Sequence, residues 1–99
     1  MITVIRTFNI NPGKQAQAVA WLHEIAALGK AENGIETTIS LPIGGNPNRI
    51  RATTRHENLA AMETRFAKLS TLPSYQELAA AGSEFISTES TFLEFWRDA

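Results

Sequence analysis

The chain has 99 residues, of which 43% are hydrophobic and 19% charged, and its net charge is −1. This length and composition predict one domain spanning residues 1–99, with no overall field to attract nucleic acid or acidic lipid. The sequence contains no cysteine, which excludes disulfides, thiolate nucleophiles and thiolate metal sites. Apolar runs are short, and strand-like alternation begins at residue 2, so we expect a cytoplasmic protein without a membrane partner.

Residues 2–10 have the two-residue period of a β-strand that is half-buried in a sheet. The apolar side of this strand carries Ile2, Val4, Phe8 and Ile10. Two positions break the pattern, since Ile5 is apolar on the polar side and Arg6 is charged on the apolar side.

A helix is predicted to follow this strand. Asn11 is a good N-cap and Pro12 suits the first helical position. Apolar residues at helical spacing continue the helix to about Lys30, and Asn33-Gly34 supplies the stop.

Two more strands are predicted at residues 35–41 and 49–56, and the loop between them contains two prolines and two glycines. They should form a hairpin. One face of the strand at residues 49–56, the third in the chain, carries Ile50, Ala52, Thr54 and His56.

The last part of the chain predicts a broken helix and a strand. Asn58 is the N-cap, and proline at Leu72-Pro73-Ser74 interrupts the helix, which Ser74 can cap again. The expected buried residues are Leu59, Met62, Phe66 and Leu69 before the break, and Tyr75, Leu78 and Phe85 after it. The final strand is predicted at residues 89–96.

The order β-α-β-β-α-β predicts an α+β, ferredoxin-like fold in which two helices cover one face of a four-stranded antiparallel sheet. The other face should then be polar in a monomer. On the last strand, however, Phe92, Glu94 and Trp96 occupy one side and Leu93 and Phe95 the other.

We assign the first set to the helix side, so that Leu93 and Phe95 form an uncovered apolar patch with Ile5. Such a patch marks a partner, and a second copy about a twofold axis is the simplest one, which predicts a homodimer. The alternative is that one strand is misregistered by a residue, which would exchange its faces.

Several segments resemble the NIPSNAP-like family of the dimeric α/β-barrel superfamily. They are Ile5-Arg6-Thr7-Phe8, Pro12-Gly13-Lys14, Glu57-Asn58-Leu59, Arg65 and Leu72-Pro73-Ser74-Tyr75. The chain departs from the family where relatives carry aromatics leaving the third strand, since it has Thr54 and His56, and at Met62, where relatives carry arginine. The resemblance implies a homodimer whose two sheets close a barrel, and a pocket between sheet and helices in each subunit. The wider superfamily includes cofactor-free quinol monooxygenases, haem-degrading monooxygenases and small isomerases or cyclases.

Arg6, His56 and Tyr75 are the candidate catalytic residues. Arg6 on an inward face could bind a carboxylate, a phenolate or a developing oxyanion, or it could simply pair with Glu94. His56 is a candidate acid or base, or a surface histidine at the strand end that replaces a packing aromatic. Tyr75 could donate a hydrogen bond into a cavity opened by the helix break, or pack as an ordinary aromatic.

The wider candidate ligand-binding set adds three residues of the same strands, namely Phe8, Thr54 and Glu94. The expected ligand is a small aromatic or anionic molecule.

No cofactor is expected. The segment after Pro73 has no histidine to ligate haem, and His23 and His56 match no metal-ligand spacing. Strand 49–56 lacks the aromatics of RNA-recognition domains, which argues against nucleic acid. Two hypotheses remain open: a cofactor-free monooxygenase or isomerase, and a non-catalytic dimeric binding or accessory module.

Overall fold

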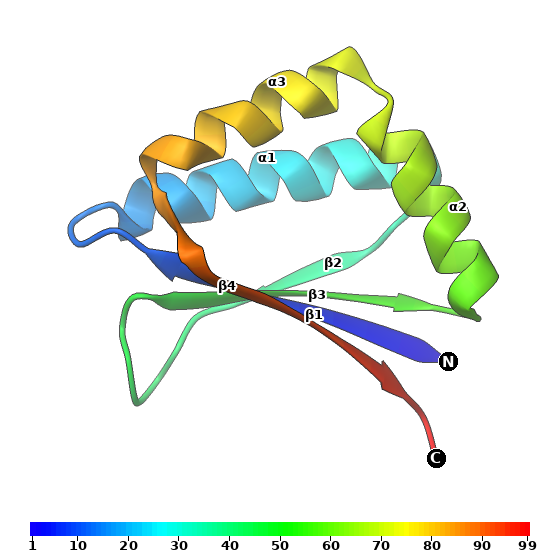
Figure 1. Cartoon of the computed structure of the whole chain (residues 1–99), viewed down its shortest axis with the longest axis horizontal. Helices are drawn as coiled ribbons and strands as arrows, with labels where there is room; N and C mark the ends of the chain where they lie inside the picture. Colours follow the sequence, from blue (N-terminus) through cyan, green and yellow to red (C-terminus); the bar gives the residue numbers. More distant parts are fainter.

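The computed structural model of the chain is a four-stranded antiparallel sheet with helices on one face (Figure 1). Its backbone is described over residues 1–99 and its side chains over 1–87 and 91–99. In chain order the elements are β1 (Ile2–Ile10), α1 (Gln15–Asn33), β2 (Thr37–Ser40), β3 (Arg49–His56), α2 (Leu59–Ser70), α3 (Pro73–Ala81), a 3-10 turn (Gly82–Glu84) and β4 (Ile86–Arg97). The strand order is β2-β3-β1-β4. The predicted ferredoxin-like α+β fold is confirmed.

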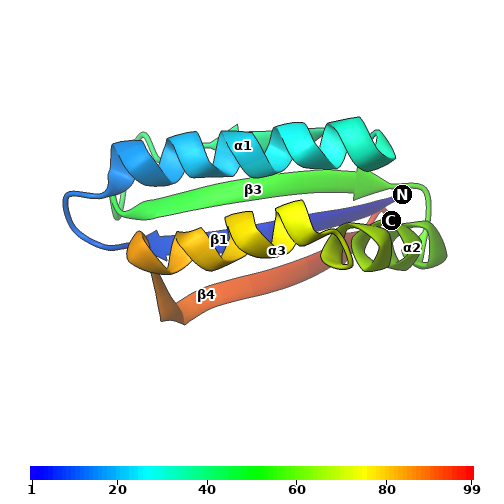
Figure 2. The same ribbon diagram turned by 90° about the horizontal axis from the view of Figure 1, so that it is seen from above.

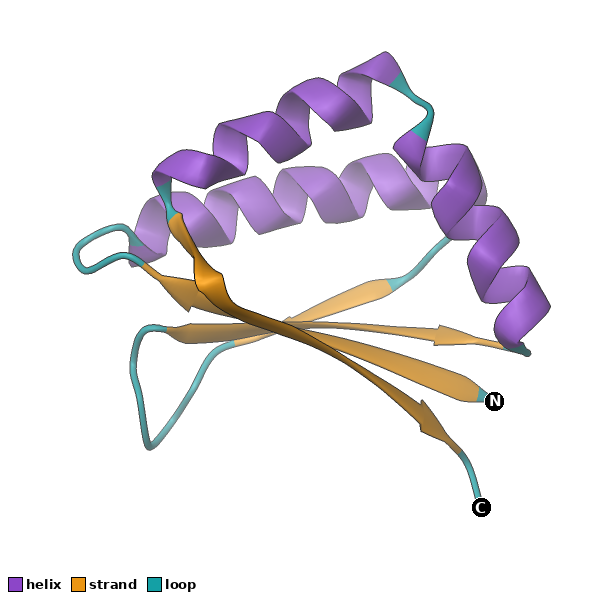
Figure 3. Cartoon of the chain, in the orientation of Figure 1, coloured by secondary structure: helices purple, strands orange, loops and turns teal.

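The helices and the sheet form two layers. All three helices lie on the same side of the sheet, and the other face has no helix against it (Figure 3). Seen from above, α1 and α3 run along the sheet while α2 lies at the end that holds both termini (Figure 2). At that end the backbone N–H of Asp98 donates to the carbonyl of Met1 at 3.1 Å.

The first helix begins later than predicted, at Gln15 rather than at Pro12. The reason is Gly13, whose φ of 80° is incompatible with a right-handed helix, so the segment before α1 turns instead. Asn11 therefore does not cap the helix, and its backbone N–H donates to the carbonyl of Phe85 at 2.8 Å. The predicted stop is confirmed, because α1 ends at Asn33 and Gly34 adopts the left-handed conformation.

The break in the second helical region is confirmed, and its chemistry differs in one detail. Asn58 caps α2 as predicted, since its Oδ1 accepts from the N–H of Ala61 at 2.8 Å. At α3, however, Leu72 is the N-cap and Pro73 takes the first helical position, so Ser74 does not cap it.

The predicted burial is confirmed for Met62 and Leu69 in α2, whereas Leu59 is 52% exposed at its start. The predicted burial after the break is wrong in degree, since Tyr75, Leu78 and Phe85 are only half-buried. Strand β2 covers only residues 37–40 of the predicted 35–41, whereas β3 has the predicted bounds.

The core gathers around Trp21 of α1. The Trp21 ring meets Phe8 of β1 edge-on with centroids 6.0 Å apart, and it lies 6.5 Å from the Phe85 ring. Its Nε1–H donates to the carbonyl of Leu78 in α3 at 2.6 Å. A smaller cluster at the other end of the sheet joins Ile2, Val4 and Met62, with Phe66 packed against it. Trp21 thus ties α1 and α3 to the sheet.

The face assignment of β4 was wrong. Leu93 pairs with Arg6 and Phe95 with Val4, so Leu93 and Phe95 lie on the helix side. Glu94 pairs with Ile5 and Phe92 with Thr7, which places Phe92, Glu94 and Trp96 on the open face. Directly opposed residues in an antiparallel pair point to the same face.

The cause is a shift in pairing between β1 and β4. Thr7 and Asn9 are two positions apart, but their partners Phe92 and Ser87 are five apart. The odd difference exchanges the faces of β4 on either side of the irregularity. The alternative of a misregistered strand was therefore the correct one, and Leu93 and Phe95 do not share a face with Ile5.

Gly82 has no room for a side chain. A Cβ at this position would lie 2.8 Å from Cε2 of Trp21 and closer still to two other atoms of the indole ring. We expect Gly82→Ala to lower the free energy of unfolding by about 1–3 kcal/mol, because overpacking displaces the ring. Urea denaturation measures this, with Gly44→Ala as the control, since a Cβ at Gly44 meets nothing within 4 Å. Equal stability of the two variants would contradict the role of this contact.

Candidate functional site

A cavity of about 450 Å³ lies between the helix layer and the sheet. Its floor is the inner face of β1, β2 and β3, and its walls come from all three helices. Most of the lining is apolar and includes Phe8, Leu22, Ile39, Phe66 and Leu69. The polar side chains of the lining are few: Arg6, Thr37, Thr54, Ser70 and Tyr75. A mainly apolar cavity with a few polar groups is the usual form of a small-molecule site.

Arg6 is on the cavity floor, as predicted from its place on the apolar side of β1. The predicted alternative, a pair with Glu94, is wrong, because Glu94 is on the opposite face of the sheet. Arg6 makes no hydrogen bond or ion pair with any residue whose side chain is described. A guanidinium keeps its charge at any physiological pH, so this cation is available to an anionic group inside the cavity.

Of the other candidates, Phe8, Thr54 and Tyr75 also line the cavity. His56 does not line it, although it lies on the same face of β3 as Thr54. The His56 side chain is completely buried and its ring packs edge-on against Phe66, with centroids 5.3 Å apart.

His56 is held by a chain of hydrogen bonds. Arg65 of α2 approaches His56 Nδ1 with its Nη1 at 3.0 Å, and His56 Nε2 lies 2.9 Å from Thr54 Oγ1. The other end of the Arg65 guanidinium binds Glu57, at 3.0 Å from Oε2. This series of hydrogen bonds runs from the cavity to the surface. It cannot relay a proton, because the Arg65 guanidinium does not release a proton at physiological pH.

The pKa of His56 is lowered below its usual value. Burial of the ring is the main cause, the positive charge of Arg65 adds to it, and the negative charge of Glu57 opposes it. The neutral imidazole is therefore the form that fits this site. Arg65 entered the prediction only through the family resemblance, and Glu57 only as part of a motif. The sequence signal for their pairing is weak, because they lie eight residues apart across the start of α2.

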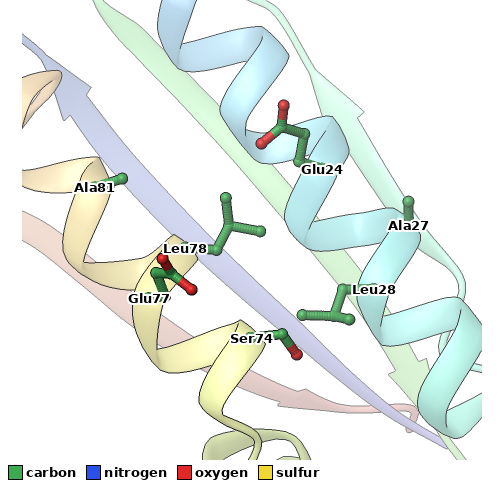
Figure 4. Close-up of a pocket in the computed structure, with 7 residues that line it drawn as sticks. All are labelled: Glu24, Ala27, Leu28, Ser74, Glu77, Leu78 and Ala81. Carbon is green, nitrogen blue, oxygen red and sulfur yellow. The ribbon is translucent and has the colours of Figure 1, made fainter.

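A second hollow lies on the outside of the helix layer, between α1 and α3 (Figure 4). It is an open groove with Leu28 and Leu78 at its base and the carboxylates of Glu24 and Glu77 at its sides. None of the described side chains that line this groove is cationic, whereas Arg6 lines the inner cavity, so we place the candidate site in the inner cavity.

Neither a metal site nor a membrane-spanning helix is found in the described parts of the chain. Among the residues with described side chains, no three histidines or carboxylates lie close enough to hold a metal ion. None of the described helices is long and apolar enough to cross a membrane.

Solved structures share this architecture closely. A NIPSNAP domain protein from Burkholderia xenovorans matches 100% of this chain and 95% of its own, with a TM-score of 0.85 and 14% identity. A NIPSNAP family protein from Agrobacterium tumefaciens matches 99% of this chain and 92% of its own, with a TM-score of 0.84 and 18% identity. The chain has the fold of the NIPSNAP proteins.

The same fold extends to a proposed antibiotic biosynthesis monooxygenase from Deinococcus radiodurans, which matches 100% of this chain and 93% of its own, with a TM-score of 0.75 and 19% identity. No protein-family model and no curated protein matches the sequence. At these identities the likeness establishes the NIPSNAP-type fold, and the chemistry has to come from the residues of this chain.

Titration of His56 should make the stability depend on pH. Because the folded pKa is lowered, the unfolded state binds more protons than the native state as the pH falls through about 6.5. The stability due to neutral His56 is thus complete above this pH and is lost below it, by at most about 1.4 kcal/mol per pH unit. We expect His56→Gln to flatten the decline between pH 7.5 and 5.5 in urea denaturation.

The matched control is His23→Gln, because His23 is exposed on α1. It should retain the wild-type dependence on pH. If His56→Gln declines as steeply as the wild type, His56 is not buried in its neutral form.

Proposed function

We propose that this protein is a NIPSNAP-type small-molecule binder whose ligand is a compact, largely apolar molecule with one anionic group. The observation that carries the proposal is the Arg6 guanidinium, which lies on the floor of an otherwise mainly apolar cavity without a protein partner among the described residues. The Arg6 side chain is still exposed, so water can satisfy its donors, and a carboxylate or phenolate that displaces this water supplies charge-assisted hydrogen bonds in its place.

The cavity limits the size and shape of this ligand. A volume of about 450 Å³ is at the lower end of the range for small-molecule sites, and suits one aromatic ring with its substituents. The aromatic rings of Phe8, Trp21 and Phe66 line the space. An apolar aromatic body with its acid group at Arg6 satisfies both the walls and the charge.

Catalysis is the second candidate function. Proteins with this fold include proposed antibiotic biosynthesis monooxygenases from Deinococcus radiodurans and Nitrosomonas europaea. For a cofactor-free oxidation the substrate itself has to supply the electrons, so an electron-rich phenol or hydroquinone is required, with Arg6 stabilising its anion. His56 is outside the lining, which leaves Tyr75 as the proton-handling candidate of the original three.

Among the described residues of the lining there is no histidine, aspartate or glutamate to act as a general base, so we propose binding first and keep catalysis as the alternative. Oxygen uptake with a naphthohydroquinone separates the two functions. Oxygen uptake above the spontaneous rate that disappears in Arg6→Met would establish catalysed oxidation of the substrate, as the monooxygenase alternative requires.

We also propose that two copies associate through the open faces of their sheets. Phe92 and Trp96 on this face are 46% and 57% exposed, and Ile5 lies beside them. The same face carries Glu94 on β4 and Arg51 on β3, and neither has a partner among the described residues. Two such faces related by a twofold axis are complementary in charge as well as apolar, which favours a second copy over other partners.

The prediction for ligand binding uses 4-isopropylbenzoate and its neutral analogue 4-isopropylbenzamide as probes. Replacing Arg6 by methionine removes the charge while retaining a long apolar side chain. We expect Arg6→Met to weaken binding of the benzoate about 10- to 100-fold, since hydrogen bonds to charged groups contribute about 1.5–3 kcal/mol. Binding of the benzamide should change much less. Isothermal titration calorimetry measures both.

Lys14→Met is the control, because Lys14 is exposed just before α1 and does not line the cavity. It should leave the affinity for both probes unchanged. Failure of the wild type to bind the benzoate, or an equal loss in the two variants, would rule out Arg6 as the anion site.

The prediction for assembly concerns Trp96. We expect the wild type to sediment as a dimer at micromolar concentration and Trp96→Glu to sediment as a folded monomer, because a carboxylate would be buried in the apolar interface. Leu59→Glu is the control, since Leu59 is similarly exposed but belongs to the helix layer. A monomeric wild type would contradict the proposed dimer.

A further inference from the structure

Thr54 has a special position on the floor of the cavity. It lies on β3 opposite Val4 of β1 and Thr37 of β2, so it is a diagonal neighbour of Arg6, which pairs with Ala52. Diagonal neighbours on one face of a sheet are about 7–8 Å apart. The cavity therefore presents two polar groups side by side, one charged and one neutral, beneath apolar walls.

The hydrogen bonds beneath Thr54 determine the direction of its hydroxyl. Arginine has only donors, so the 3.0 Å contact between Arg65 Nη1 and His56 Nδ1 requires that Nδ1 accept. A neutral imidazole then carries its hydrogen on Nε2, and this N–H donates to Thr54 Oγ1 at 2.9 Å. The Thr54 oxygen is thus an acceptor in this bond.

This leaves the hydroxyl hydrogen of Thr54 for another acceptor. None of the residues with described side chains accepts it. The imidazole cannot turn away easily, because the Phe66 ring packs edge-on against it and Glu57 holds Arg65 from the other side. Thr54 lines the cavity, so this hydrogen is available to an acceptor inside that space.

We propose that Thr54 determines the specificity of the cavity, as a donor whose direction is set by His56 and Arg65. This inference rests on the proposed binding function and adds a second requirement to it. The preferred ligand carries a neutral oxygen acceptor, such as a carbonyl, on the side of the molecule away from its acid group. His56 is a positioning residue here, because it acts on the ligand through Thr54.

The test compares two ligands of nearly the same shape, 4-acetylbenzoate and 4-isopropylbenzoate, of which only the first has the acceptor. We expect the wild type to bind 4-acetylbenzoate about 3- to 10-fold more tightly, the usual range for one neutral hydrogen bond. Thr54→Val, which has the same shape without the hydroxyl, should abolish this preference. Arg6→Met should weaken both ligands and leave their ratio unchanged. Calorimetry gives each ratio within one variant, so a difference in stability between variants does not affect it.

Two substitutions of His56 test its positioning role. Glutamine can accept from Arg65 and donate to Thr54, so His56→Gln should keep the preference for the acetyl compound. Phenylalanine fills the space but does neither, so His56→Phe should reduce the ratio. A purely structural role would not distinguish the two ligands in this way.

The outcomes separate this inference from the proposed function. If the wild type binds both benzoates equally, or if Thr54→Val keeps the preference, the role of Thr54 is overturned and Arg6 remains the anion site. If neither benzoate binds to the wild type, the proposed function fails and this inference fails with it.

Discussion

The contacts of Trp21 are the interaction on which the rest of the structure depends. One indole ring packs against Phe8 of the central strand, leaves no space for a side chain at Gly82, and hydrogen-bonds the carbonyl of Leu78. It therefore fixes the height of α3 above the sheet at one end of the helix layer. At the other end, Met62 and Phe66 of α2 pack on Ile2 and Val4. Between these two supports the break at Pro73 lets the layer bend, and the cavity lies under the bend.

Much of the fold followed from local patterns in the sequence. The alternation in β1 and β3, the stop at Gly34 and the proline break each depend on a few neighbouring residues, and each was confirmed. The faces of β4 were not predictable in this way. Pairing with β1 shifts by an odd number of residues between Phe92 and Ser87, and a shift of that kind is a property of two strands together. The alternation within β4 divides its residues into two sets, but it does not determine which set faces the helices.

The candidate site shows the same division. Arg6, Phe8, Thr54 and Tyr75 were identified because their strands or helix point them inward, and the structure brings them to one cavity. The prediction that His56 shares a face of β3 with Thr54 is confirmed, but the predicted surface location is wrong, because the side chain is completely buried. Its neighbour Arg65 comes from a helix nine residues later, so a contact between the two is decided by how α2 packs on β3. This packing turns a candidate acid or base into a buried neutral group that orients another side chain.

The thin burial of α3 has a consequence for access to the cavity. None of its residues is fully buried, although Tyr75 and Ala79 line the cavity. Moving α3 outward would break the hydrogen bond between Trp21 and Leu78 and the packing of the half-buried Leu78 against the core, but would uncover no fully buried residue of α3. Segments with few buried contacts are the first to open in native proteins. Outward movement of α3 is therefore the least costly way to admit a ligand to the cavity, and the Trp21 hydrogen bond opposes this movement. Hydrogen exchange of the α3 amides would detect such local opening.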